Sequence, residues 1–175
     1  ALTATPTRMM RATSRPPRAV AQLPGTGHRH PADRPVRRLC LFAGYDRDGL
    51  VDDYVVAYVR ELARFADVYY MADGEMQPGQ LERLAPYVKG AWAERHGKYD
   101  FGSYSELVAR IGWDAIGGYD ELLFVNDSCY LLRGLDDVFA RMDARPCDWW
   151  GLQATKGIAE TRCKASNCFR MPIPM

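Results

Sequence analysis

From Leu39 onward the chain alternates between short apolar runs and segments with helical periodicity, a pattern that is typical of β-α-β units and a parallel sheet. The run 122–125 has four apolar residues in succession, which predicts a central strand covered on both faces. Strands are expected over 39–44, 68–71, 88–93 and 122–125, with a further strand or strand end over 148–152. The sequence therefore predicts an α/β, Rossmann-like fold with a mainly parallel sheet.

Helices are predicted between these strands. One apolar face recurs at helical spacing through Val51, Val55, Tyr58, Val59 and Leu62, and Asp48 is its expected N-cap. Ser103 and Glu106 have the spacing of a capping box, which predicts a helix over 103–111. A short helix over 80–84, stopped by Pro86, and a helix over 136–142 complete the pattern.

The charge distribution divides the chain into two parts. Residues 1–38 contain eight Arg, no Lys and one Asp, with six of the eleven prolines, so the formal net charge of +1 hides a basic arm before an acidic body. The arm lacks apolar clusters, which predicts disorder over 1–37. Three interpretations stay open for it: a non-native leader, an organelle transit sequence, or a tail that touches anionic lipid or nucleic acid. Residues 38–155 form the expected domain, and 156–175 an irregular tail.

The expected location is the cytoplasm, including the inner face of the membrane. No apolar stretch approaches the roughly 18 residues of a membrane span, so at most peripheral membrane contact is expected. Five cysteines with wide, irregular spacing argue against a disulfide scaffold and favour a reducing compartment.

Candidate chemistry gathers where the predicted strands end. Ligands of open α/β sheets bind at the carboxyl ends of parallel strands, so polar residues directly after a strand are the ones to consider. Four segments qualify: 45–49, 99–102, 126–128 and 148–150.

Asp127 is the candidate metal ligand. Sugar transfer from a nucleotide diphosphate needs a counterweight for the charge that builds on the departing phosphates, and Mg²⁺ or Mn²⁺ held by carboxylates supplies it. Asp127 follows the predicted strand 122–125 directly, which is a suitable place. A turn or cap role is the alternative for Asp127, and Asn126 and Ser128 have the same alternative.

Several motifs in succession resemble the rhamnan synthesis protein F family. The resemblance covers about residues 38–155 and rests on the motifs Phe42-Ala43-Gly44-Tyr45-Asp46, Asp48-Gly49, Val51-Asp52-Asp53-Tyr54, Tyr99-Asp100-Phe101-Gly102-Ser103-Tyr104, Tyr119-Asp120-Glu121-Leu122, Asn126-Asp127-Ser128 and Asp148-Trp149-Trp150-Gly151-Leu152. Many family members carry Asn-x-Gly before the Tyr-Asp-Phe-Gly motif, whereas this chain has Arg95-His96-Gly97-Lys98.

The resemblance implies the N-terminal part of a GT-A-like glycosyltransferase, truncated at its C-terminus. It implies a nucleotide sugar as donor, with dTDP-rhamnose the expected one, and a saccharide or lipid-linked acceptor that grows into a cell-surface polysaccharide. No nucleic-acid partner is expected for this enzyme. Residues 126–128 stand where GT-A enzymes keep an Asp-x-Asp metal motif, but this sequence has one carboxylate there, so the need for Mg²⁺ or Mn²⁺ is left open.

Roles for single residues follow from the resemblance and from position. The expected substrate contacts are Gly44, Tyr45 and Asp46 in the nucleotide pocket, Asp100 on the donor sugar or diphosphate, Asn126 and Ser128 beside the metal ligand Asp127, and Trp149 and Trp150 as an aromatic face for the acceptor. Asp148 is the expected general base. A helix-cap role for Asp100 and core packing for a tryptophan are the alternatives, and His96 is expected at the surface.

Two other functions stay open. Residues 41–49 resemble the strand and Asp-x-Asp-Gly motif of haloacid-dehalogenase-like phosphatases, with Asp46 as nucleophile and Asp48 as acid and base, although Leu50 departs from that pattern. The chain could also be a non-catalytic nucleotide-binding fragment.

Overall fold

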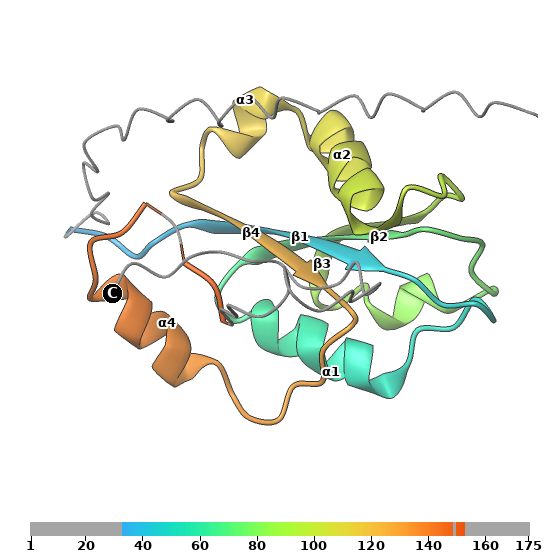
Figure 1. Ribbon diagram of the computed structural model, residues 1–175, viewed down its shortest axis with the longest axis horizontal. Coiled ribbons are helices and arrows are strands. Elements are labelled where there is room, and N and C mark those ends of the chain that lie inside the picture. The colour runs from blue at the N-terminus through green and yellow to red at the C-terminus, as the bar shows by residue number, and fades with distance from the viewer. Residues whose placement is uncertain (1–32, 149, 153–175) are drawn as a thin grey trace, which may run out of the picture.

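Figure 1 shows the computed structural model, which describes residues 33–148 and 150–152 of the chain. Helices and strands alternate along these residues, as the sequence predicts for an α/β, Rossmann-like fold. In chain order the elements are β1 (Arg38–Gly44), α1 (Asp53–Leu62), β2 (Asp67–Ala72), the 3-10 helix η1 (Leu81–Arg83), β3 (Val88–Ala93), α2 (Tyr99–Ile111), α3 (Trp113–Ile116), β4 (Glu121–Asn126) and α4 (Asp136–Asp143).

The strands form one parallel sheet in the order β3-β2-β1-β4. The register sets Gly44 opposite Ala72 and Ala43 opposite Asn126, so the strands end together at one edge, here called the carboxyl edge. The opposite edge, where β1 and β4 begin, is called the amino edge. The chain builds β2 and β3 on one side of β1 and then places β4 on the other side. The strand order therefore reverses between β1 and β4, which is where open α/β sheets form a ligand crevice.

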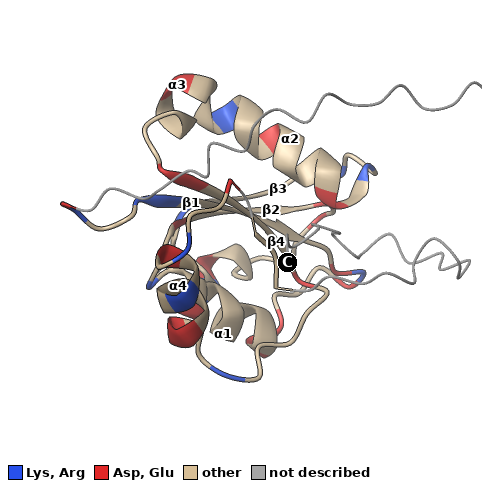
Figure 2. Ribbon diagram, turned by 60° about the vertical axis from the view of Figure 1, so that its left-hand side comes forward, with Lys and Arg blue, Asp and Glu red and all other residues tan. Residues whose placement is uncertain are grey.

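β1 organises the core because all seven of its residues are buried. Successive side chains of a strand point to opposite faces, so Cys40 and Phe42 join one apolar cluster while Leu39 and Leu41 join another. Figure 2 shows the resulting layers, with α1 and α4 on one face of the sheet and α2 and α3 on the other. The sheet is thus a rigid middle layer.

Two helix starts differ from the sequence prediction. The apolar face of α1 is confirmed, but its N-cap is Asp52 rather than Asp48. α2 begins at Tyr99, so the predicted capping box at Ser103 is wrong: Ser103 lies inside the helix and is 1% exposed. The short helix α3 was not predicted, because its four residues are too few for a periodic signal.

β4 is not a central strand within the described residues, which corrects the prediction. It stands at the edge of their sheet, and Phe124 is 41% exposed. Leu122 packs against one core cluster and Leu123 and Val125 against the other. A run of apolar residues indicates that both faces of a strand are packed against other elements. A central position in the sheet depends instead on hydrogen-bonded neighbour strands on both sides. Residues 148 and 150–152 contain no strand, contrary to expectation, and residue 149 lies outside the described residues.

The predicted arm and tail lie mostly outside the described residues. The last residues of the arm are described, and there the Arg34 guanidinium forms two hydrogen bonds with the Asp120 carboxylate, at 2.6 and 2.8 Å. Residues 1–32 and the tail 156–175 are not described. In the described part of the chain, no helix combines the length and apolar character of a membrane span.

Candidate functional site at the carboxyl edge

Asp127 lies at the carboxyl edge, directly after β4. Its backbone NH donates to the Ala43 carbonyl at 3.2 Å, and its carboxylate accepts a hydrogen bond from the Tyr45 NH at 2.6 Å. The Tyr54 hydroxyl on α1 donates to the Asp127 carbonyl at 3.1 Å. Asp127 is therefore fixed between the ends of β1 and β4 and the first turn of α1. This place, where the strand order reverses, is called the crevice below, after the ligand sites of other open α/β sheets.

The Asp127 carboxylate lies in an electrostatically unfavourable place. Burial raises its pKa to about 6, the Tyr45 NH opposes part of this rise, and the negative charges of Asp100 and Asp46 add to it. Among the described residues, none of these three carboxylates has a Lys or Arg partner. The crevice therefore holds negative charge that a bound cation would stabilise.

Asp100 and Asn126 meet as the sequence analysis expects of two residues of one site. Asp100 occupies the first turn of α2, and Asn126 is the last residue of β4. The Asn126 amide nitrogen donates to the Asp100 carboxylate at 2.7 Å, which leaves the second carboxylate oxygen of Asp100 free of that bond. The amide thereby orients Asp100 beside Asp127.

Gly44 has a packing role at the end of β1. A Cβ atom placed on it would lie 2.0 Å from the Tyr70 hydroxyl oxygen, so only glycine fits there. Tyr45 follows, with its NH bonded to Asp127 and its side chain 64% exposed. The structure thus puts Gly44 beneath the crevice and Tyr45 at its surface, while a nucleotide contact for either one stays a prediction.

Asp46 stabilises its own turn. One carboxylate oxygen accepts hydrogen bonds from the NH groups of Asp48 at 2.8 Å and Leu50 at 2.9 Å. The Asp48 carboxylate is exposed and lies 3.5 Å from the Arg47 guanidinium. No contact links Asp46 and Asp48 as a nucleophile and its acid partner, so the geometry offers nothing specific to a phosphatase.

The carboxyl edge offers few side chains that could hold a metal ion. No group of three or more His, Cys, Asp or Glu side chains is placed to hold a metal within the described residues. Asp127 can offer one oxygen beyond the one bonded to Tyr45, with Asp100 and Asp46 near enough to act on its pKa. Mg²⁺ commonly binds through one or two carboxylates together with phosphate oxygens. Ser128, next to Asp127, is exposed at the mouth of this edge.

A second polar network, which the sequence analysis missed, lies after β2. The Asp73 carboxylate accepts hydrogen bonds from the NH groups of His96 at 3.0 Å, Gly97 at 2.8 Å and Tyr99 at 3.3 Å. The His96 Nε2 lies 3.0 Å from the Ser103 hydroxyl oxygen. The His96 side chain is 4% exposed, so its predicted surface position is wrong. The network holds the loop between β3 and α2.

The Asp73 network positions the start of α2, and with it Asp100. Burial opposes ionisation of Asp73, but the NH groups of the loop and the nearby His96 outweigh it and lower the pKa. Tyr99 adopts a positive φ of 56°, a conformation that a non-glycine residue rarely takes without such restraints. Asp73 follows a strand directly, as Asp127 does and as Asp46 nearly does, and this position is the signal that could have identified it.

Trp150 lies at the amino edge. Its indole NH donates to the Glu121 carboxylate at 3.2 Å, and its ring packs edge-on against Phe139 with centroids 5.6 Å apart. Glu121 begins β4 and Asp127 follows its end, so roughly 20 Å of strand separates them. Core packing, the alternative to an acceptor contact, is what the structure shows for Trp150.

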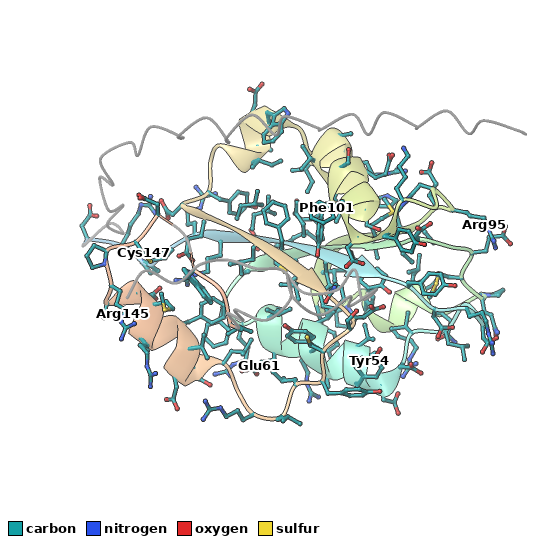
Figure 3. The ribbon with its side chains drawn as sticks, in the orientation of Figure 1. Tyr54, Glu61, Arg95, Phe101, Arg145 and Cys147 are labelled. Atoms are coloured by element: carbon teal, nitrogen blue, oxygen red, sulfur yellow. The ribbon has the colours of Figure 1, made fainter. Side chains whose placement is uncertain are left out.

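Asp148 lies on the same side as Trp150. It acts electrostatically on Cys147, as does Glu121 at the start of β4. Figure 3 shows Cys147 on the left of the molecule, whereas Tyr54, which contacts Asp127, lies farther right on α1. The structure therefore does not bring Asp148 together with Asp127, and Trp149 lies outside the described residues.

Comparison with known proteins gives one match. The family model described as rhamnan synthesis protein F matches residues 68–170, which is more than half of the chain. Searches of curated proteins and of solved structures found no match. The matched segment includes Asp73, Asp100 and Asp127, so it contains most of the acidic groups at the carboxyl edge.

Proposed function

Because the chain belongs to the rhamnan synthesis protein F family, we propose that it serves rhamnan synthesis as a glycosyltransferase. The donor is a nucleotide-diphosphate sugar, with dTDP-rhamnose the first candidate. The acceptor is a saccharide or lipid-linked chain of a cell-surface polysaccharide. The reaction belongs in the cytoplasm, including the inner face of the membrane.

One observation carries the proposal: an acidic crevice lies where the strand order reverses. Asp127 is anchored there to β1 through the Tyr45 NH, and Asp100 is oriented beside it by Asn126. Open α/β sheets bind nucleotides at this place, because loops and helix starts converge at the carboxyl ends of the strands. A site for a diphosphate that arrives with a cation requires carboxylates that lack a cation of their own.

The residues of the crevice would have separate roles in binding the donor. Asp127 would hold Mg²⁺ or Mn²⁺, which when bound neutralises the diphosphate that leaves the sugar. The Tyr45 NH keeps the Asp127 carboxylate aimed into the crevice. Asp100, held by Asn126, can accept a hydrogen bond from a donor hydroxyl with its second oxygen. Asp73 keeps the start of α2, and therefore Asp100, in place.

Thermal unfolding with a set of nucleotide sugars tests the proposal. A ligand that binds only the folded chain raises its stability by RT ln(1 + [L]/Kd), so dTDP-rhamnose is expected to raise Tm, and more so with Mn²⁺. Asp127→Asn, which keeps the size and the acceptor for the Tyr45 NH, is expected to remove most of the Mn²⁺-dependent rise. Asp120→Asn, at the other end of β4, is the matched control and should keep it. Equal shifts for the wild type and Asp127→Asn would contradict the proposal.

A further inference from the structure

A pocket lies beside the crevice. It has a volume of about 480 Å³ and lies between the start of α1, η1 and the loop that follows β4. This volume falls within the usual range of small-molecule sites. Tyr54 belongs to both places: it lines the pocket, and its hydroxyl bonds to the Asp127 carbonyl at 3.1 Å. A molecule in this pocket would therefore stand next to one in the crevice.

The charges of this pocket disfavour an anion. Arg83, its one lining cation among the described residues, donates to the Val51 carbonyl and to the Asp53 carboxylate. The Asp52 carboxylate also lines the pocket, is exposed and accepts no hydrogen bond from the described residues. A phosphate would meet an uncompensated carboxylate there, whereas a hydroxyl group could donate to it.

The pocket also offers an aromatic surface. The rings of Tyr54 and Tyr130 touch with centroids 4.4 Å apart and a 41° tilt, so they contact each other and leave no slot for a flat base between them. Tyr130 is 71% exposed, which presents its free surface to solvent. A sugar ring has an apolar C–H face that packs on one aromatic ring and hydroxyl groups that seek acceptors.

We propose that this pocket binds a saccharide unit of the acceptor, with the sugar ring against Tyr130 and a hydroxyl group on the Asp52 carboxylate. The inference rests on the proposed function, since it names the substrate that receives the sugar. It places the acceptor beside the donor crevice, rather than at Trp150 on the amino edge, where the sequence analysis expected it. Tyr54 is the link between the two sites.

Ligand-observed NMR titration of the full 175-residue chain with methyl rhamnoside and a rhamnose trisaccharide tests this assignment. Tyr130→Ala and Asp52→Asn are expected to weaken trisaccharide binding at least tenfold, while Kd for dTDP-rhamnose with Mn²⁺ stays within twofold of the wild type. Tyr130→Phe keeps the ring and should bind normally. Leu132→Ala is the surface control, because Leu132 is 94% exposed and lies outside the pocket lining.

The outcomes separate the two proposals. Trisaccharide binding that is absent in the wild type, or unchanged in Tyr130→Ala, would overturn the acceptor assignment and leave the glycosyltransferase proposal standing. A loss of dTDP-rhamnose binding in Tyr130→Ala would assign the pocket to the donor nucleotide and overturn the acceptor assignment as well. Failure of the wild type to bind any nucleotide sugar would instead contradict the proposed function, whatever the trisaccharide does.

Discussion

The two aspartates that flank β4 lie in opposite electrostatic settings. Asp120 precedes the strand, accepts two hydrogen bonds from the Arg34 guanidinium and one from the Arg37 NH, and has a lowered pKa because of them. Asp127 follows the strand, has no Lys or Arg partner among the described residues, and burial raises its pKa to about 6. An aspartate is thus paired with an arginine at the amino edge, whereas the aspartate at the carboxyl edge has no such partner among the described residues.

The two edges of the sheet differ in how far their charges are paired among the described residues. At the amino edge, Arg38 joins the carboxylates of Glu121 and Asp143, and its guanidinium lies 4.7 Å from the centre of the Phe139 ring. At this edge, the positive charge of Arg38 is therefore paired with carboxylates of the same chain. At the carboxyl edge, the negative charge of the carboxylates has no cationic partner among the described residues. A charged group without such a partner lowers the stability of the fold unless a bound ligand supplies the opposite charge.

Removing the compensation at the amino edge should have the largest effect. The Arg38 side chain is 5% exposed, so Arg38→Ala removes a buried guanidinium that pairs with Glu121 and should lower the free energy of unfolding by about 2–4 kcal/mol. Urea unfolding measures this loss. Arg47→Ala is the control, because Arg47 is 85% exposed and its pair with Asp48 should be worth no more than about 0.5 kcal/mol. Equal effects for the two variants would break the comparison.

A substitution beneath the crevice should come next in size. Gly44→Ala forces a Cβ toward the Tyr70 hydroxyl and is expected to destabilise the chain by about 1–3 kcal/mol, because a packed core resists extra volume. Gly74→Ala is the matched control: its Cβ would meet only the Asp46 carbonyl oxygen, at 3.9 Å. Thermal unfolding of both variants decides the point. A Gly44→Ala protein as stable as Gly74→Ala would show that the end of β1 can adjust.

The smallest expected effect is on the pH dependence of stability, which tests the difference between Asp120 and Asp127 directly. The raised pKa of Asp127 means that the folded state holds its proton more tightly, so stability falls as pH rises from about 4 to about 6. Asp127→Asn should therefore gain a few degrees of Tm over the wild type above pH 6 and nothing at pH 4. Asp120, with a lowered pKa, stabilises the fold above its unfolded pKa, and this contribution is lost as pH falls.

Asp120→Asn should accordingly lose Tm at pH 7, and this loss should begin to shrink only below the ordinary Asp pKa of about 4. The two variants thus bend the stability curve in opposite directions. Tm measured from pH 3 to pH 8 for both variants and the wild type checks the signs. Parallel curves for Asp120→Asn and Asp127→Asn would mean that the two edges do not differ in charge compensation.

The sequence predicts those features that depend on the periodicity of single elements. Strand β3 has the predicted bounds, and the apolar face of α1 is buried as expected. The residues that follow β1 and β4 converge because parallel strands end at one edge. The βαβ pattern places Asp127 and Tyr45 at the same edge of the sheet, whereas their contact depends on the pairing of β4 with β1, which the pattern does not give.

The features that the sequence does not predict depend on contacts with residues outside the local pattern. Ser103 has the local signature of a helix cap, but the buried ring of His96 engages its hydroxyl inside α2. The sequence suggests a sugar-binding role for Trp150, but its indole NH donates to the Glu121 carboxylate at the amino edge, away from Asp127. His96 lies seven residues from Ser103 and Glu121 lies 29 residues from Trp150, so both partners fall outside the short pattern that suggested the role.

The division of β1 between two cores limits how this chain can change over evolutionary time. Phe42 faces α1 and Leu41 faces α2, so inserting or deleting one residue within β1 would exchange the inward sides of everything that follows in the strand. Differences in length among related chains should therefore accumulate in the turns. New ligand preferences can then arise in the turns while the strands keep their number of residues.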